Sequence, residues 1–428
     1  MKQEIIDFLT NKKILILGYG REGKSALSFI QANLPEADFA VADQNDVQID
    51  GVRTICGENY LEAVQDYDIV IKSPGIPTHD FVPDDQLSKM TSLTDLFIRF
   101  CKNPVIGITG TKGKSTTASL THHILKTAGK NSILVGNIGI ACFDAIDQIN
   151  DDSIVVFEIS CHQLEFITAS PHVAILLNLY EEHFDHYKTP EDYFAAKKNI
   201  YKFQNSDDTF IYGDIFGHAS REEISRLPMR KIDLYQDVNI PKESIHTHLV
   251  GDHNLRDIYA AISACEVVGL SLDEILPTIE SFRGLPHRME FVGEFRHIKF
   301  YNDSIATAQE AVISAIKALG GVDTLLLGGM DRGLNYQKLV DFLRNSSVRN
   351  IILLPDTQQA FQRIFNEAPF SQNLIPVKDM QEAVEMAYKF TAENHICLLS
   401  PAAASYNTYK NFEERGEDFI TKVREYGS

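Results

Sequence analysis

Short apolar runs recur along the chain, and several of them end at glycine or at a small polar residue. Near the N-terminus these runs are Lys13–Leu17, Phe39–Ala42 and Ile69–Lys72. Continuous apolar runs are typical of strands that are buried on both faces of a parallel sheet. The stretch KSALSFIQA after the first run favours a helix, so the order of strand, glycine turn, helix and strand predicts an open α/β sheet.

The same alternation begins again near residue 104. We expect strands at Val105–Thr109, Ser132–Val135, Ile154–Ile159 and Val173–Asn178, and helices at Ser115–Ala128 and Pro190–Tyr201. The stretch Gln204–His246 is polar, and we interpret it as strands and connections at the edge of this second sheet.

A third alternation begins near Gly284. It predicts strands at Lys299–Tyr301, Thr324–Leu327, Asn350–Leu354 and His395–Leu399, and a helix at Ala308–Leu319. The sequence therefore predicts an α/β protein of three consecutive domains, at residues 1–92, 93–285 and 286–428. The first and third are expected to be Rossmann-like, and the second is expected to be an ATPase-type domain with a phosphate-binding loop.

The composition changes this picture only by exclusion. The 428 residues have a formal net charge of -19, which argues against a protein that coats nucleic acid, because phosphate binding over a large surface needs a basic face. Six scattered cysteines without a CxxC pair are typical of a reducing compartment. The charged N-terminus MKQEIIDFLTNKK is unlike a signal peptide, and no apolar stretch is long enough for a membrane span. We therefore expect a cytoplasmic protein with no membrane partner.

The strongest candidate for chemistry is the segment GITGTKGKST, which joins an apolar strand to a predicted helix. A glycine turn before a helix presents backbone N–H groups and the positive end of the helix dipole to a phosphate. Lys114 is expected to neutralise the β- and γ-phosphates of a nucleotide, and Ser115 or Thr116 to reach Mg²⁺. Ile108 stands where the standard spacing has the first glycine, so the loop is a shortened variant that begins at Gly110.

Five further features carry weaker predictions. Gly18-x-Gly20-x-x-Gly23 follows a strand, with Asp43 at the distance of a ribose-binding acid, although a plain tight turn is an equal alternative. Glu158 ends an apolar strand, where it could bind Mg²⁺ or be a solvated carboxylate.

The run Glu181–His186 could supply metal ligands, a base or only a polar loop. Lys197 lies on a helix whose apolar residues face inward, and such a lysine is usually a surface side chain with a buried stem. Asn254, after Gly251, is interpreted equally well as a helix cap.

In this order the motifs resemble those of the Mur ligases of bacterial peptidoglycan synthesis, over essentially the whole chain. The motifs are GYGREGKS, KSPGIP, GITGTKGKST, GNIG, EISCHQLE, NLYEEHFDHY, YFAAKKNIY, GDHNLRD, GLPHRME, YNDSIAT and LLSPAAASYNTYKNFEERG. The resemblance implies an ATP-dependent amide-bond ligase with two Mg²⁺ sites, which forms an acyl phosphate that an amino acid then attacks. It is strongest to members that join glutamate, D-glutamate above all, to UDP-N-acetylmuramoyl-L-alanine, and it implies a monomer.

The resemblance also implies roles for individual residues. The expected contacts to the UDP-linked substrate are Gly20, Arg21, Asp43, Ser73, Pro74, Gly75, Asn137, Ser160 and Gln163. The expected contacts to ATP are Gly110, Thr111, Gly113, Lys114, Ser115, Thr116, Asn254, Asp257, Arg288 and Asp303. The expected metal-linked residues are Ser115, Glu158, His183 and Lys197. Lys114, His183 and Lys197 are the expected catalytic residues, and Lys197 matches the lysine that the family carries as a carbamate.

The amino-acid pocket implied by the resemblance contains Thr307, Arg332, Ser405 and Phe412. The chain departs from the glutamate-adding pattern here, because Ile305 and Arg332 stand where lysines are usual. Arginine can still hold a carboxylate with two hydrogen bonds, whereas isoleucine cannot. An enzyme that adds L-glutamate to the same acceptor is therefore an alternative.

Three other functions are weighed against this one. A folylpolyglutamate-synthase-like ligase has no need of the first-domain GxGxxG and SPGIP motifs. A regulatory P-loop NTPase leaves NDSIAT and NFEERG unexplained. An NAD-dependent oxidoreductase would rest on the first domain alone, without a constellation for hydride transfer.

Overall fold

The computed structural model describes residues 1–77, 82–180, 186–187, 189–249, 251–330, 335–366 and 371–427. The chain forms two compact units. Residues 1–246 and 253–279 make up the first, and residues 247–252 and 280–428 make up the second. None of the helices in the described part of the chain is long and apolar enough to cross a membrane.

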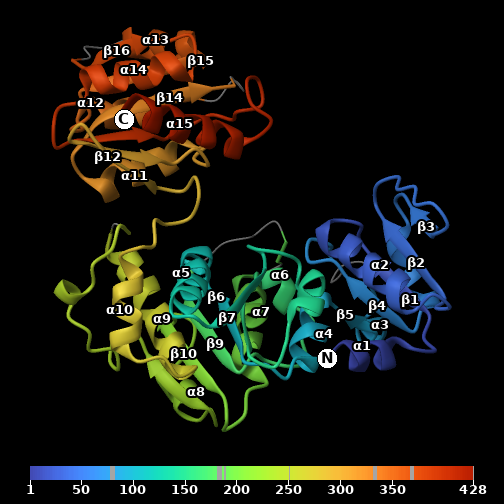
Figure 1. The fold of residues 1–428 in the computed structure, drawn as a ribbon. Helices are drawn as coiled ribbons and strands as arrows, with labels where there is room; N and C mark the ends of the chain where they lie inside the picture. Colours follow the sequence, from blue (N-terminus) through green and yellow to red (C-terminus); the bar gives the residue numbers. More distant parts are fainter. Residues whose placement is uncertain are drawn as a thin grey trace. The chain divides into compact units, whose positions relative to one another are not determined.

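The N-terminal sheet of the first unit is parallel, with strand order β3-β2-β1-β4-β5 (Figure 1). Its strands are β1 (Ile14–Leu17), β2 (Phe39–Asp43), β3 (Arg53–Cys56), β4 (Ile69–Lys72) and β5 (Met90–Thr91). Its helices are α1 (Lys2–Leu9), α2 (Arg21–Asn33), η1 (Tyr60–Asp66), α3 (Asp84–Leu87) and α4 (Leu93–Phe100). Strand β1 is buried on both faces, because Ile14 and Ile16 share a core with α2 while Leu15 and Leu17 share one with η1.

The second sheet of this unit is also parallel, in the order β11-β10-β9-β6-β8-β7. Its strands are β6 (Val105–Thr109), β7 (Asn131–Gly136), β8 (Ser153–Glu158), β9 (Val173–Asn178), β10 (Thr209–Asp214) and β11 (Arg230–Asp233). Because β6 is paired with both β8 and β9, the carboxyl ends of these three strands meet at one edge, where parallel α/β sheets bind ligands.

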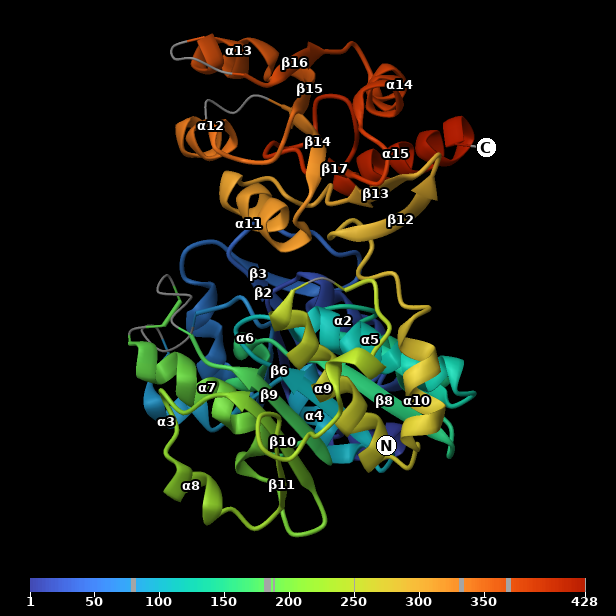
Figure 2. The same cartoon turned by 90° about the vertical axis from the view of Figure 1, so that its left-hand side faces the viewer.

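Helices cover this central sheet. They are α5 (Lys114–Thr127), η2 (Cys142–Gln148), α6 (Cys161–Leu164), α7 (Pro190–Lys202), α8 (Arg221–Ser225), η3 (Lys242–Ser244), α9 (Asp252–Val267) and α10 (Leu272–Ile279). Helix α5 packs on β7 and β8, and α10 packs on α5 (Figure 2).

The second unit has one mixed sheet, in the order β12-β13-β17-β14-β15-β16. Its strands are β12 (Glu290–Phe295), β13 (Ile298–Asn302), β14 (Val322–Gly329), β15 (Asn350–Asp356), β16 (Asn373–Pro376) and β17 (Ile396–Leu399). Only β12 is antiparallel to its neighbour among these described strands. Residues of α11 (Gln309–Leu319), α12 (Gln337–Arg344) and α13 (Gln358–Asn366) form one core, and those of α14 (Met380–Phe390) and α15 (Phe412–Gly427) form another.

The predicted α/β class and each predicted strand are confirmed, with ends that differ by a few residues. Strands β10 and β11 lie at the sheet edge, as the polar stretch Gln204–His246 indicated. The β12–β13 hairpin, β16 and the helix α14 were not predicted. Each predicted domain contains one sheet, whereas the boundaries at 92 and 285 stay predictions.

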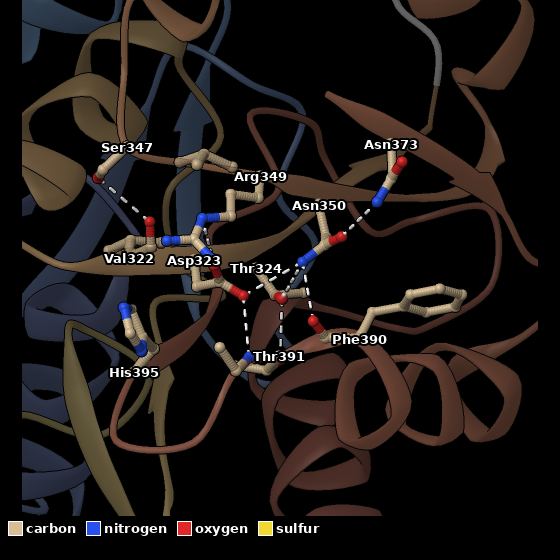
Figure 3. Close-up of polar contacts among 12 residues, drawn as sticks. Val322, Asp323, Thr324, Ser347, Arg349, Asn350, Asn373, Phe390, Thr391 and His395 are labelled. Carbon is tan, nitrogen blue, oxygen red and sulfur yellow. Dashed lines mark hydrogen bonds and ion pairs between the residues drawn. The ribbon is translucent and has the colours of Figure 1, made fainter. Parts of the chain in front are cut away.

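A buried polar network ties together the amino ends of β14 and β15 (Figure 3). The Asn350 side-chain amide donates to Asp323 Oδ2 at 3.2 Å, to Thr324 Oγ1 at 3.3 Å and to the Phe390 carbonyl at 3.0 Å. Its oxygen accepts from Asn373 Nδ2 at 2.9 Å. Asn350 thus joins two strands to the end of α14, at the edge of the sheet opposite the carboxyl ends of the strands.

Replacing Asn350 with alanine should lower the stability of the second unit by about 2 kcal/mol, because several buried polar atoms lose a partner. Scanning calorimetry of the full chain should show a lower Tm. The matched control is Asn345→Ala, an exposed asparagine at the end of α12, which should change stability by less than about 0.5 kcal/mol. Equal shifts for the two variants would contradict this role for the network.

Candidate functional site

The loop between β6 and α5 has the backbone that a phosphate cradle requires. Gly113 precedes α5 with φ of 86°, a left-handed conformation that favours glycine. A Cβ at Gly113 would also overlap the Asp257 carboxyl group. The first N–H groups of α5 therefore point out of the sheet edge unobstructed by a side chain at this position.

Neighbouring strands and helices hold this loop in place. Asn178 accepts from the Lys112 N–H at 2.8 Å and donates to its carbonyl at 3.1 Å. The Thr111 hydroxyl lies 3.0 Å from the Tyr193 hydroxyl, and the Thr111 N–H donates to the Asn178 carbonyl at 3.1 Å. The loop conformation is thus fixed by the protein alone, before any nucleotide binds.

Two lysines converge on one carbonyl oxygen of the loop. Lys114 Nζ donates to the Gly110 carbonyl at 2.9 Å and Lys197 Nζ donates to the same oxygen at 2.8 Å. Lys197 is only 1% exposed, so the interpretation of this lysine as a surface side chain is wrong. Its position on α7, three and four residues from Ile200 and Tyr201, puts it on the buried face of the helix.

Glu158 lies at the carboxyl end of β8 and is completely buried, so the alternative of a solvated carboxylate is wrong. Its Oε1 accepts from Asn137 Nδ2 at 3.0 Å. Its Oε2 is buried and has no hydrogen-bond partner among the described residues. A buried carboxylate oxygen without a partner fits a site for a cation.

Other expected metal-linked residues add little to this site. Ser115 lies in the first turn of α5, whereas His183 lies outside the described residues. No group of three His, Cys, Asp or Glu side chains with metal-binding spacing occurs within the described ranges. Lys197 as an ammonium ion cannot be a metal ligand, and its role there depends on carbamylation.

Asp257 on α9 closes the other side of the phosphate loop. Together with Lys112, Asn178, Tyr180 and Arg256 it lines a cavity of about 320 Å³. Burial raises the pKa of its carboxyl group from 3.8 to about 8, although a hydrogen bond with Thr117 partly opposes the shift.

Because the raised pKa lies above neutral pH, the Asp257 carboxyl group is mostly neutral there. Asn254 lies one turn earlier on α9.

The expected substrate residues of the N-terminal sheet also lie together. Gly20 precedes α2, and the Arg21 guanidinium donates to the Gly136 carbonyl of the central sheet. Asp43 accepts from the Tyr19 N–H at 2.7 Å, and Ser73 Oγ donates to the Gly18 carbonyl at 2.9 Å. The glycine loop is therefore held between Asp43 and the 73–75 turn, which Pro74 and Gly75 complete.

Ser160 and Gln163 are engaged with each other. The Ser160 N–H donates to Gln163 Oε1 at 2.8 Å, and the Ser160 hydroxyl accepts from the Gln163 N–H at 3.3 Å, which makes a capping box at the start of α6. Gln163 Nε2 donates to Glu22 Oε1 at 2.7 Å. Contact of these side chains with a substrate stays a prediction.

Two of the remaining expected residues, Asp303 and Phe412, lie in hydrogen-bonded clusters of the second unit. Asp303 is buried between β13 and β17, where its Oδ2 accepts from Ser400 Oγ at 2.7 Å and its Oδ1 accepts from the Met289 N–H at 3.2 Å. Burial raises the pKa of Asp303 to about 6, against hydrogen bonds and the charge of Arg288 that lower it. Arg288 and Thr307 are exposed.

Arg415, which the sequence did not single out, organises this cluster. It is 1% exposed and donates to the Ser304 hydroxyl at 3.0 Å, to the Ser304 carbonyl at 2.8 Å and to the Ala403 carbonyl at 3.0 Å. Ser304 in turn donates to the Phe412 carbonyl at 2.8 Å. A cavity of about 460 Å³ adjoins the cluster, lined by Ser405, Arg415 and the carboxyl ends of β14 and β15. Arg332 lies outside the described residues.

Comparison with known proteins decides the family. The Mur ligase middle domain matches residues 108–233, and the Mur ligase glutamate ligase domain matches residues 287–403. The chain is 31% identical to the UDP-N-acetylmuramoylalanine–D-glutamate ligase of Listeria innocua, over 98% of each chain. The chain belongs to the Mur ligase family.

Solved structures of Mur ligases share the fold. A UDP-N-acetylmuramoyl-L-alanyl-D-glutamate–2,6-diaminopimelate ligase has a TM-score of 0.61 at 15% identity, covering 97% of this chain and 92% of the other. The MurF ligase of Thermotoga maritima in complex with ADP has a TM-score of 0.54 at 15% identity, covering 96% and 95%. This Mur ligase is accordingly an ATP-dependent, amide-bond-forming enzyme of the family's three-domain α/β fold.

No role was predicted from the sequence for several buried charged residues of this Mur ligase, among them Lys72, Glu165 and Arg415. A helical pattern could have found one of them. Arg415, Phe419 and Val423 recur every four residues along α15, so Arg415 lies on the apolar face of the helix. Lys72 and Glu165 lie at the ends of short elements, where too few residues follow a helical or strand pattern to predict which side chains are buried.

Replacing Asp257 with asparagine should make this Mur ligase more stable, by a margin that grows with pH. The folded-state pKa of Asp257 is raised, so the folded protein binds a proton that the unfolded chain loses between about pH 4 and 8. Wild-type stability therefore falls relative to the variant over that window, and the difference levels off above about pH 8. Calorimetric Tm values from pH 5 to 9 should diverge accordingly.

Asp207→Asn, which makes the same change at an exposed position, is measured alongside as the matched control. A constant difference between wild type and Asp257→Asn across the series would show that Asp257 is ionised throughout.

Proposed function

We propose that this Mur ligase joins glutamate, with D-glutamate favoured, to UDP-N-acetylmuramoyl-L-alanine in the synthesis of peptidoglycan precursors. The observation that carries the proposal is the identity of 31% over 98% of the chain to an enzyme named for that reaction. Support comes from the preformed phosphate loop and from the clustering of Gly20, Arg21, Asp43 and Ser73 around one glycine turn. The expected site of action is the cytoplasm.

The chemistry requires activation of a carboxylate, because its oxygen is too poor a leaving group for an amine to displace. The carboxylate oxygen of the acceptor attacks the γ-phosphorus of ATP, ADP departs, and an acyl phosphate results. The glutamate nitrogen then attacks the acyl carbon, loses a proton, and inorganic phosphate leaves.

Two anions must approach each other in the first step, so the protein acts by positioning and by electrostatic stabilisation. Lys114 has its ammonium group beside the Gly110 carbonyl of the phosphate loop, where it would neutralise the β- and γ-phosphates. The amide N–H groups at the start of α5 hold the same phosphates.

Two Mg²⁺ ions would supply the remaining positive charge, and Glu158, Ser115 and His183 would hold them with Lys197 as a carbamate. The bare Oε2 of Glu158 supports a cation there. Carbamylation would turn Lys197 into an anion in a buried place that already contains the Lys114 cation, which relieves the repulsion between two ammonium groups on one carbonyl.

The amino acid would bind in the second unit near Thr307, Ser405 and Phe412, with Arg332 holding a carboxylate. Ile305, where lysine is usual, is half-buried, and its N–H donates to the His287 carbonyl at 3.1 Å. One cation fewer in the pocket makes the choice between D- and L-glutamate the point to test.

Lys114→Ala should abolish ligation, by at least about a hundredfold in kcat, because the charge that offsets phosphate repulsion is lost. Phosphate release in the presence of ATP, UDP-N-acetylmuramoyl-L-alanine and D-glutamate measures it. The affinity for the UDP-linked substrate, measured by calorimetric titration, should be unchanged in the variant. Activity within a few-fold of wild type would refute the assignment of the loop.

The substrate itself is tested by phosphate release from wild-type enzyme with D-glutamate, L-glutamate and other amino acids in parallel. We expect phosphate release only when D-glutamate and the UDP-linked acceptor are both present. Preference for L-glutamate would establish the alternative amino acid, and turnover with a folate acceptor would establish a folylpolyglutamate-synthase-like ligase. ATP hydrolysis that needs no amino acid would indicate a regulatory NTPase.

A further inference from the structure

A buried ion-pair network joins the two sheets of the first unit away from the phosphate loop. Lys72 Nζ lies 2.9 Å from Glu165 Oε2, and His186 Nε2 lies 2.6 Å from Glu165 Oε1. The three side chains are 2%, 3% and 9% exposed. Nothing in the reaction described above uses any of them, although three such groups are costly to bury.

Each partner of Glu165 leads to a different part of the proposed site. Lys72 ends β4 and also donates to the Pro74 carbonyl at 3.2 Å, which anchors the 73–75 turn. His186 directly follows the segment that contains His183 along the chain. Glu165 itself follows α6, only seven residues after Glu158.

A second link runs parallel to the first. Gln163, also in α6, donates to Glu22 beside the Gly20–Arg21 turn. The segment from Glu158 to Glu165 is therefore attached at both the glycine loop and the 73–75 turn of the N-terminal sheet. These contacts tie both turns to the segment that follows the carboxyl end of β8.

We propose that Glu165 is a positioning residue, which holds the 73–75 turn in register with the carboxyl end of β8 and so places the UDP-linked substrate. This inference rests on the proposed function, in which that turn contacts the substrate. A displacement of the reactants by about 1 Å can cost about a hundredfold in rate. A buried ion pair that fixes the turn can therefore affect the reaction through the position of the substrate. Glu165 touches no reacting atom.

A purely structural role makes a different prediction. Breaking a buried pair leaves an uncompensated charge and destabilises the fold, which would lower the amount of active enzyme equally for all three substrates. Loss of positioning would instead weaken one substrate selectively. Measuring KM and kcat separately for each substrate therefore distinguishes a positioning role from a purely structural one.

The test measures phosphate release by the full chain with ATP, UDP-N-acetylmuramoyl-L-alanine and D-glutamate for Glu165→Gln and for the double variant Lys72→Gln/Glu165→Gln. In Glu165→Gln, KM for the UDP-linked substrate should rise about tenfold or more, while KM for ATP and glutamate stays within about twofold. Glu222→Gln, which removes an exposed pair with Arg226, is the matched control and should change none of them.

The double variant separates stability from positioning. It leaves no unpaired Lys72 ammonium group, so its Tm should recover toward the wild-type value, whereas KM for the UDP-linked substrate should stay raised. Recovery of KM together with Tm would overturn the proposal, as would a selective KM effect of Glu222→Gln. If Glu165→Gln does not fold, the KM of the double variant tests the Lys72–Glu165 tether as a unit, and a KM at the wild-type value would overturn the proposal. Absence of turnover in the wild type would refute the proposed function instead.

Discussion

Buried positive charge at the edge of the central sheet is the constraint on which the rest of the first unit depends. An enzyme that brings a triphosphate and a carboxylate together must keep cations at the meeting point, also when no substrate is bound. Two ammonium groups, from Lys114 and Lys197, accordingly share the Gly110 carbonyl. Glu158, at the end of the adjacent strand β8, is a completely buried carboxyl group of this region. The Gly110 carbonyl thus accepts hydrogen bonds from the two lysines until the phosphates of a nucleotide take its place as their partner.

This arrangement explains why the loop is held so firmly by neutral groups. Asn178, Thr111 and Tyr193 fix it through hydrogen bonds that do not depend on a nucleotide. If the loop were held by the lysines instead, their release to phosphate would loosen it during the reaction. Separation of the holding groups from the reacting groups lets Lys114 move without a change in the cradle.

The strands could be predicted from the pattern of apolar residues along the sequence. The burial of charged side chains could not. Apolar runs such as Val105–Thr109 and Val173–Asn178 become buried parallel strands because no other structure satisfies their backbone and side chains together. Periodicity does not predict the burial of Lys197 and Arg415, because a charged residue on an apolar helical face is normally expected to extend to solvent. Their partners include backbone carbonyls far away in sequence, such as those of Gly110 and Ser304, which no pattern in a single sequence reveals.

Asp257 shows how the same constraint acts on an acid. An ionised carboxylate touching Gly113 would repel the phosphates that the loop is built to hold, and it would lower the affinity for ATP. Burial by α9 raises the pKa of Asp257 to about 8, so the group is mostly protonated at neutral pH and can lie against the cradle without that repulsion. Glu158 differs from Asp257, because one of its oxygens accepts from Asn137 and the other is buried with no hydrogen-bond partner among the described residues. The phosphate loop therefore adjoins one carboxyl group that burial keeps mostly neutral, while Glu158 at the same sheet edge has an oxygen without a partner that fits the proposed cation site.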